Sequence, residues 1–399
     1  MTEDVSHIYY PREWALARAA KELPDAGLDD LPAVFARPPW RPRRHPPRTV
    51  LNRTAPIRPV TLQWQPGERQ RWAEAPVRGE ERWREEASTV LGNARSTSPY
   101  LPILLAVAPE EVALAQLRVF APPYRPHMAT YRRLVGRFEL DAMEFVFSGV
   151  RRFSNLAGVL APADGTAVSL FWAHWMNSGR CRTGAGLRWF DRHIDTAATD
   201  LIATALTRSG KDRVPAERTL RILAAAGHGD TIRAAAEAYH PQAPAALDAI
   251  VDIDPLLLLP KRIPRLRAWI SLDRLPKVLL RRGDTVLPVS AMADLCTMLM
   301  MCRPGHDYAG VGAVTEATEP TTLARFAREL LDQWVRAGCP QKDDWVLHAQ
   351  GLIGDHDTVR YMHVLTKRWL RMADSGRAAT DALYDGRLAQ VGHALYGGA

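Results

Sequence analysis

The sequence predicts an all-α protein in which residues 185–399 form a solenoid of stacked helical hairpins. One observation is a pair of short amphipathic helices around a turn rich in glycine and aspartate at residues 343–370. A second observation is the return of the same helix–turn–helix pattern at residues 216–240. Two helices joined by so short a link lie antiparallel, and the faces that they leave uncovered need further helices beside them. The pattern therefore indicates a repeat unit rather than a free-standing fold.

The hairpin at residues 343–370 carries the local signals of two helices. Asp355 or Asp357 can cap the second helix by accepting a hydrogen bond from one of its first-turn amides. Apolar residues of this second helix recur at three- and four-residue steps, and we expect them to face the first helix: Val359, Met362 and Leu365.

The two copies share a tetrapeptide at the start of their second helix. Asp230-Thr231-Ile232-Arg233 matches Asp357-Thr358-Val359-Arg360 in residue type at every position. The copies lie 127 residues apart, which is about three units of the length expected for HEAT or armadillo repeats. The sequence therefore predicts a HEAT-like helical-repeat solenoid.

A series of short motifs runs in order through this half of the chain. The series is Trp189-Phe190-Asp191-Arg192-His193, Ala216-Glu217-Arg218-Thr219-Leu220-Arg221, Gly227-His228, Asp254-Pro255-Leu256, Leu259-Pro260, Pro264, Trp269, Leu279-Leu280-Arg281, Trp334, Gly338, Lys342-Asp343-Asp344-Trp345 and Gly351-Leu352-Ile353-Gly354-Asp355. Through this series, residues 188–399 resemble the MolR-like bacterial proteins, a family named for a proposed regulator of molybdate metabolism. The resemblance implies HEAT-like helices and a regulatory or interaction role, and it brings no catalytic residues.

Composition and length are those of a folded, soluble protein. The chain has 399 residues, of which 47% are hydrophobic and 24% charged, enough to bury a large core. No stretch of about 18 uncharged apolar residues occurs, so we expect no membrane span. Acidic residues stand where a secretion signal would carry basic ones, which favours the cytoplasm.

The net charge of +8 is concentrated in residues 37–84, which contain twelve arginines and four glutamates. Within this stretch, a Pro/Arg-rich segment near residues 37–60 is predicted to be extended, because its proline density forbids helix and central strand. The segment is either a solvated connector or a nucleic-acid-binding arm. In the second interpretation one tryptophan stacks on a base while arginines neutralise phosphates, and the residues involved are Trp40, Arg41, Arg43, Arg44 and Arg48.

The rest of residues 1–184 is predicted to be a mostly helical N-terminal region. We expect helices over residues 11–23, 68–91, 101–117 (with a helix start at Pro109-Glu110-Glu111) and 167–176, and either a strand or a helix over residues 138–150. The helix at 167–176 is expected to dock this region on the solenoid. His174 lies between two tryptophans and is predicted to be a core imidazole.

The helical periodicity of apolar residues is lost over residues 252–287. We expect this segment to form an extended strap across the helical stack. Asp254, before a proline, is predicted to cap a turn; a cation site at Asp252 and Asp254 is the alternative. Helices resume near residues 288–301 and 323–337.

The sequence shows no catalytic, nucleotide-binding or metal-binding motif. The sequence contains no phosphate loop, dinucleotide turn, zinc-protease helix or nucleophile elbow. Four cysteines are too few for a disulfide framework in a chain of this length, and we expect buried or incidental thiols. The spacing of His348, His356 and His363 does not force them together. No catalytic residue, metal ligand or cofactor is predicted.

These observations predict a non-enzymatic scaffold that binds another macromolecule, a protein, in a regulatory or complex-forming role. Nucleic-acid binding through residues 37–84 is one alternative. An enzyme whose site forms between the N-terminal region and the solenoid is the other.

Overall fold

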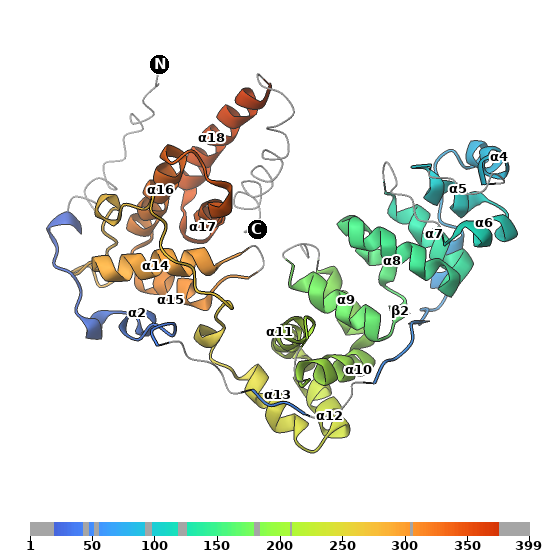
Figure 1. The fold of residues 1–399 in the computed structure, drawn as a ribbon, viewed down its shortest axis with the longest axis horizontal. Helices are drawn as coiled ribbons and strands as arrows, with labels where there is room; N and C mark the ends of the chain where they lie inside the picture. Colours follow the sequence, from blue (N-terminus) through green and yellow to red (C-terminus); the bar gives the residue numbers. More distant parts are fainter. Residues whose placement is uncertain are drawn as a thin grey trace. The chain divides into compact units, whose positions relative to one another are not determined.

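The structure, a computed structural model, is all-α as predicted, apart from one small sheet (Figure 1). It describes residues 20–42, 48–51, 56–91, 98–118, 126–178, 184–207, 210–303 and 306–374. These residues belong to two compact units. Unit 1 consists of Met1–Pro46 and Ile253–Ala399, and unit 2 consists of Pro47–Asp252. Within the described ranges, no helix is both long and apolar enough to cross a membrane.

Unit 2 consists of helices, short turns of 3-10 helix and one pair of two-residue strands. Its elements in order are β1 (Thr61–Leu62), α3 (Glu68–Ala73), α4 (Glu80–Leu91), α5 (Leu101–Val107), α6 (Glu110–Gln116), α7 (Met128–Phe138), η3 (Glu139–Ala142), α8 (Met143–Arg152), η4 (Ser154–Leu160), β2 (Ala163–Asp164), α9 (Thr166–Met176), α10 (Ala185–Ala205), α11 (Arg213–Leu223), the π-turn η5 (Ala224–His228), α12 (Gly229–Tyr239) and α13 (Ala243–Val251). The strands β1 and β2 pair antiparallel, with Thr61 opposite Asp164.

In unit 1, the five helices α14 to α18 follow a long irregular segment. Its elements are η2 (Leu28–Asp30), α2 (Ala33–Ala36), η6 (Pro255–Leu257), η7 (Leu272–Arg274), α14 (Val289–Met301), α15 (Ala309–Ala317), α16 (Pro320–Arg336), η8 (Gln341–Asp343), α17 (Trp345–Ile353) and α18 (His356–Asp374). Packing of α16 on α17 and of α14 on α15 and α17 forms its core, in which Phe326, Trp334 and Leu347 are fully buried.

The division into units differs from the boundary that the sequence suggested at residues 184/185. That boundary falls between α9 and α10, which pack directly on each other within unit 2. The indole rings of Trp172 and Trp189 stack across them with centroids 6.2 Å apart. In the N-terminal segment, the Ala26 amide donates to the Val286 carbonyl at 2.9 Å, and this bond joins the segment to the rest of unit 1.

Several predicted helices are present with altered ends. The single helix expected over residues 68–91 is instead two helices, α3 and α4. Pro76 has no amide hydrogen to continue a helix, and Gly79 adopts a φ of +72° before α4. The region that fitted either strand or helix, residues 138–150, is helical in η3 and α8. The helix expected over residues 11–23 lies mostly outside the described residues.

The prediction for α9 is correct for its tryptophans and wrong for its histidine. Trp172 and Trp175 are buried, and the helix packs on α10 and α11. His174 instead points to the surface, where its side chain is 45% exposed and its Nε2 lies 2.6 Å from Asp212 Oδ1. A tryptophan on either side therefore did not place this imidazole in the core, because neighbouring residues on a helix point in different directions.

The two similar sequence segments each form helix, short link and helix, but with different faces buried. In unit 2, α11 and α12 both pack on α10, and Ile232 of α12 is buried. In unit 1, the matching Val359 of α18 is 40% exposed, so its predicted place in the helix seam is wrong. Met362 and Leu365 are buried as expected. Thr358 takes the inward position beside Val359, because it forms the cap of the helix.

That cap confirms the predicted start of α18. Asp355 Oδ1 accepts hydrogen bonds from the amide and the hydroxyl of Thr358, at 2.8 and 2.9 Å. The Thr358 hydroxyl in turn accepts from the Asp355 amide at 3.1 Å. Reciprocal bonding of this kind satisfies amide donors that have no partner inside the helix.

The predicted interruption at residues 252–287 is confirmed, since it contains only the three-residue turns η6 and η7 between helices. Asp254 Oδ1 accepts from the Leu256 amide at 2.9 Å, as expected of a capping residue. Asp343 holds the segment in place by accepting from Arg267 Nε at 2.6 Å and from Trp269 Nε1 at 2.9 Å. The segment is therefore packed into unit 1 rather than free.

A buried ion cluster fixes the extended segment before β1. The Arg58 guanidinium contacts Asp164 at 2.9 Å and Asp200 at 2.7 Å, and both carboxylates are almost fully buried. Asp200 also accepts from the hydroxyls of Thr166 at 2.8 Å and Ser169 at 2.7 Å. Burial alone would raise the pKa of Asp164, but the hydrogen bond from Arg58 holds that pKa below its usual value.

We predict that Arg58→Ala lowers the free energy of unfolding by about 3–5 kcal/mol, because it leaves two buried carboxylates without their cation. Denaturant unfolding followed by circular dichroism measures this loss. Arg82→Ala is the control, since Arg82 is exposed, and its contacts are with Glu86 and the Trp83 ring on the same helix. A loss no larger than that of the control would contradict the structural role of the cluster.

A matched pair on α18 tests its buried face. Met362→Ala should cost about 2–5 kcal/mol of unfolding free energy, as expected for a fully buried side chain. Val359→Ala should stay within about 0.5 kcal/mol of wild type, as expected for a surface position. Similar losses at both positions, measured by chemical denaturation of the whole chain, would show that the helix faces are assigned wrongly.

Candidate functional site

The residues proposed to contact nucleic acid are partly engaged in packing. The ring of Trp40 packs edge-on against Tyr308 with centroids 6.0 Å apart, within the unit 1 core. Arg41 lies 2.6 Å from the buried carboxylate of Asp294. Arg48 is exposed, and Arg43 and Arg44 lie outside the described residues.

The tryptophans further along the basic segment pack against other aromatic rings. Trp72 is buried and meets Trp64 edge-on at 5.5 Å. Trp83 lies against Tyr100 at 5.1 Å. Rings held in this way are not free to stack on successive bases, which is what single-stranded nucleic-acid binding requires.

Cysteine and histidine side chains form no metal cluster in the part of the chain that the structure describes. Cys296 and Cys302 are buried, and burial raises the pKa of each thiol to about 12. Both thiols are therefore protonated at neutral pH and poorly nucleophilic. His348 Nε2 lies 2.6 Å from Asp307 Oδ1 rather than beside the other two histidines of its hairpin.

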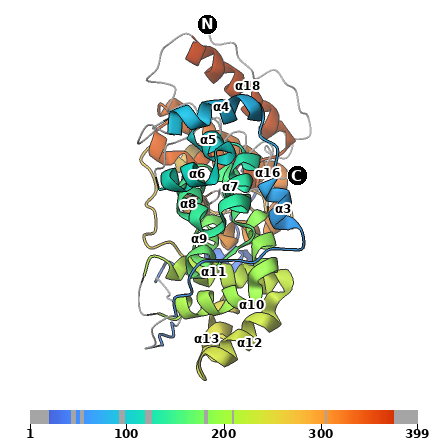
Figure 2. The same cartoon turned by 90° about the vertical axis from the view of Figure 1, so that its right-hand side faces the viewer.

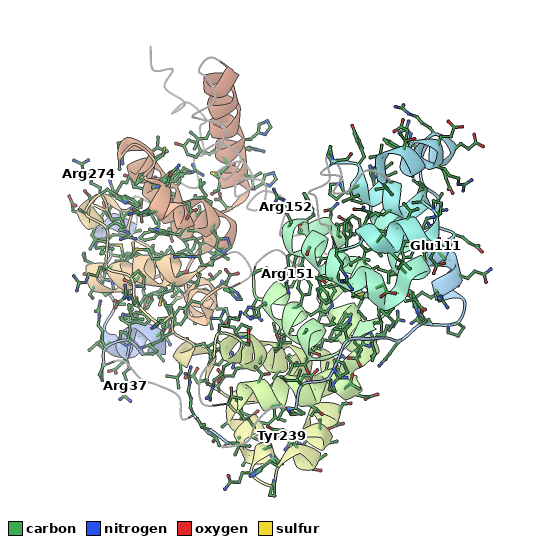
Figure 3. All side chains as sticks on the ribbon, turned by 45° about the vertical axis from the view of Figure 1, so that its right-hand side comes forward. Arg37, Glu111, Arg151, Arg152, Tyr239 and Arg274 are labelled. Atoms are coloured by element: carbon green, nitrogen blue, oxygen red, sulfur yellow. The ribbon has the colours of Figure 1, made fainter. Side chains whose placement is uncertain are left out.

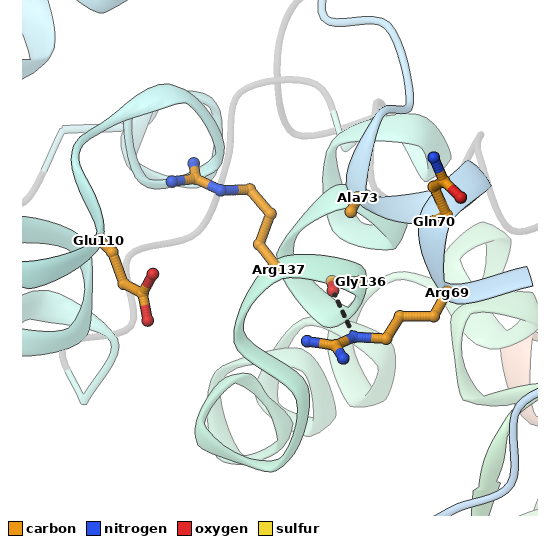
Figure 4. Close-up of a pocket in the computed structure, with 6 residues that line it drawn as sticks. All are labelled: Arg69, Gln70, Ala73, Glu110, Gly136 and Arg137. Atoms are coloured by element: carbon orange, nitrogen blue, oxygen red, sulfur yellow. Dashed lines mark hydrogen bonds between the residues drawn. The ribbon is translucent and has the colours of Figure 1, made fainter.

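The most distinctive polar surface among the described residues is a pair of adjoining open hollows on unit 2. They have volumes of about 370 and 410 Å³ and share Ala73 of α3 and Arg137 of α7. The first is lined by Arg69, Gln70, Ala73, Glu110, Gly136 and Arg137 (Figure 4). The second is lined by Ala73, Arg84, Val107, Ala108, Pro109, Arg133 and Arg137. Because four arginines from α3, α4 and α7 line them, we call the two hollows together the arginine groove.

The helices α3 and α7, which supply three of the four arginines, pack closely on each other; both are labelled in Figure 2. A Cβ atom at Gly136 would lie 2.3 Å from the Ala73 nitrogen and 2.7 Å from the Trp72 carbonyl carbon. Only glycine fits at such a distance from another backbone. Arg69 reinforces the contact by donating from Nε to the Gly136 carbonyl at 3.4 Å.

The end of α7 is held in a strained conformation beside the groove. Glu139 has a φ of 47°, a value that residues with a side chain rarely adopt. Its carboxylate accepts from Trp64 Nε1 at 3.1 Å and lies 3.2 Å from Arg69 Nη2. These two contacts hold the Glu139 side chain in place.

Arg137 differs from the other arginines of the groove in its partners. Its Nη1 and Nη2 donate to the carbonyls of Ala106 and Ala108, at 2.7 and 2.8 Å. Within the described ranges, no carboxylate lies within ion-pair distance of it. Burial lowers the pKa of Arg137, and repulsion from Arg133 lowers it further. The side chain is half-buried and extends away from Arg69 (Figure 4).

The neighbouring arginines share one internal counter-ion, Glu80. Arg133 contacts this carboxylate through two nitrogens, each at 2.7 Å, and Arg84 contacts it at 2.6 Å. The hydrogen bond from Arg133 is the largest cause of the lowered pKa of Glu80, which keeps the carboxylate ionised. Arg133 is therefore largely satisfied, whereas the side chain of Arg84 stays 59% exposed.

This arrangement suits the binding of an anionic group. The Arg137 guanidinium donates to carbonyls and lies over the Phe138 ring, 4.7 Å from its centroid. A half-buried guanidinium without a carboxylate at ion-pair distance gains electrostatic energy when a carboxylate or phosphate approaches it. The printed lining of the two hollows includes one carboxylate, that of Glu110, and no histidine, cysteine or hydroxyl side chain. Side chains elsewhere on the surface carry both signs of charge, for example Glu111 and Arg151 (Figure 3).

Sequence reasoning did not predict this groove. The basic segment at residues 37–84 includes Arg69 and Arg84, but the residues predicted to contact nucleic acid lie earlier in it, and Arg133 and Arg137 lie beyond it. The spacing of four residues between Arg133 and Arg137 was a usable signal, because residues so spaced share one face of a helix. The sequence does not show that this face meets α3 and α4.

Comparisons with known proteins assign no function. No family model and no solved structure matches the chain. Over 216 residues, which are 54% of this chain, it is 26% identical to the uncharacterised protein YehI of Escherichia coli K12. The matched stretch covers 18% of that protein's length, so this chain spans less than a fifth of that relative.

We predict that Gly136→Ala disrupts the groove, because the added methyl group would overlap with the α3 backbone. The free energy of unfolding should fall by about 2–4 kcal/mol. Gly229→Ala is the matched control, since a Cβ there meets no atom within 4 Å and alanine favours a helix. Thermal unfolding of both variants provides the comparison. Equal stability would contradict the close approach of α3 and α7.

Proposed function

We propose that this chain is a non-enzymatic HEAT-like scaffold of the MolR-like kind that binds a protein partner in the cytoplasm. Its role is to form or regulate a complex. The ordered motif series in residues 188–399 supports this proposal through its resemblance to MolR-like proteins.

The serial packing of helices supports the scaffold role. In unit 2, α10 contacts α9, α11 and α12, and α12 contacts α13. In unit 1, α14 contacts α15 and α17, and α16 contacts α17. Arrays in which helices contact near neighbours along the chain leave long faces available for a partner.

The single observation that carries the proposal is the half-buried charge of Arg137 in the arginine groove. A protein surface with spaced acidic side chains supplies the carboxylate that this guanidinium lacks. Arg is also among the residues that contribute most binding energy at protein interfaces. A nucleic acid is less well suited, because Glu80, Glu110 and Glu139 stand among the arginines and would repel a continuous row of phosphates.

Affinity capture from the native cell tests this function. The full chain and its Arg137→Gln variant are used as baits, with and without nuclease, and bound proteins are quantified by mass spectrometry. We expect at least one partner that resists nuclease and that the variant recovers about tenfold less well. Arg82→Gln is the control, because it removes an exposed arginine outside the groove.

Two results would overturn the proposal. One is that all capture disappears after nuclease treatment, which would favour nucleic-acid binding. The other is that the wild type, Arg137→Gln and Arg82→Gln baits recover the same proteins in equal amounts.

A further inference from the structure

We infer that the arginine groove takes a carboxylate side chain from an acidic peptide segment at Arg137 and Arg84, and that Glu80 competes with it internally. This inference rests on the proposed function and names the chemistry of the partner at that site. Its basis is the uneven neutralisation of the four arginines.

The four arginines of the groove differ in how fully carboxylates of the same chain neutralise them. Arg133 is only 13% exposed, and its two terminal nitrogens bond Glu80. Arg69 is engaged by Glu139 and by the Gly136 carbonyl. Arg137 and Arg84 are the two arginines that are less fully neutralised. Arg137 donates to two carbonyls and lies over the Phe138 ring, 4.7 Å from its centroid, with no carboxylate at ion-pair distance among the described residues. Arg84 directs one nitrogen to Glu80 while most of its side chain is in solvent.

Both unsatisfied arginines line the second hollow, so one ligand group placed there can meet both. Planar guanidinium groups present paired N–H donors that match the two oxygens of a carboxylate. The apolar floor of this hollow, formed by Val107, Ala108 and Pro109, suits the methylene groups of a glutamate side chain. It also reduces water contact, which strengthens the ion pair.

Glu80 opposes the incoming anion and at the same time holds Arg133 and Arg84. A carboxylate ligand must approach this fixed negative charge, which costs binding energy through like-charge repulsion. Replacing Glu80 by glutamine removes the charge but keeps an oxygen that accepts from Arg133. The structure therefore predicts a gain of anion affinity on losing Glu80, an effect that a purely structural ion pair would not produce.

The test measures binding of a fluorescein-labelled hexaglutamate peptide to the full chain by fluorescence anisotropy at about 150 mM salt, where long-range charge effects are screened. Hexaglutamine is the uncharged reference. Arg137→Gln and Arg84→Gln should each weaken binding, by about tenfold and about threefold. Glu80→Gln should tighten it by about threefold.

Matched controls lie on the same helix as Glu80 and Arg84. Arg82→Gln and Glu86→Gln make the same charge changes at an exposed pair outside the groove, and both should bind as wild type. Arg84 is exposed, so its variant tests the site even if Arg137→Gln alters folding by releasing the Ala106 and Ala108 carbonyls.

Failure to bind hexaglutamate would overturn the inference, as would equal shifts in the groove and control variants or weaker binding by Glu80→Gln. Inorganic phosphate and a single-stranded oligonucleotide serve as competitors. If either displaces the peptide completely at a lower concentration than free glutamate peptide does, the site is a phosphate site instead. A protein partner whose capture still depends on Arg137 while the peptide fails to bind would refute only the carboxylate chemistry and leave the proposed function standing.

Discussion

The architecture of unit 2 depends on the contacts of Arg58 with Asp164 and Asp200. These carboxylates lie at the junction of β2, α9 and α10, and Arg58 comes from the extended segment that leads into β1. Two buried carboxylates would repel each other and lose hydration without this cation. By satisfying them, Arg58 holds the start of unit 2 against helices more than one hundred residues later in the chain. The next helix, α3, has an attachment of its own to α10, because Arg192 Nη2 lies 2.7 Å from the Glu68 carboxylate.

The groove shows how charge is distributed by a helical scaffold. Glu80, Glu110 and Glu139 lie among the arginines of α3, α4 and α7, and each arginine has different hydrogen-bond and ion-pair partners. Glu80 satisfies Arg133 and part of Arg84, and Glu139 reaches Arg69 from a strained backbone position. Arg137 donates to carbonyl oxygens at the end of α5 and of the residue after it, and its guanidinium lies over the Phe138 ring. Arg137 is thereby left without a carboxylate at ion-pair distance among the described residues, while the arginines around it are paired within the chain.

Unit 1 uses a different device to hold an irregular segment. Residues 252–287 lack regular backbone pairing over most of their length, so side chains must bind them to the helices. Asp343 accepts from both Arg267 and Trp269, and the Trp269 ring stacks on Trp345 with centroids 6.2 Å apart. Gln333 adds bonds to the backbone of Ser271. Helix and strap are thus joined by a few polar contacts rather than by a ladder of backbone hydrogen bonds.

The sequence alone determined the helical class and several helix ends, because these signals are local, although it did not predict the break between α3 and α4. The all-α class, the interruption at residues 252–287 and the caps at Asp254 and Asp355 follow from periodicity, proline and short polar side chains. Tertiary structure alone decided which residues face inward and which segments share a unit. Val359 and Ile232 occupy matching positions but differ in burial, because different neighbours cover their helices. The groove exists because Gly136 admits another backbone at short distance, and contacts between residues so far apart in the chain leave no periodic trace in the sequence.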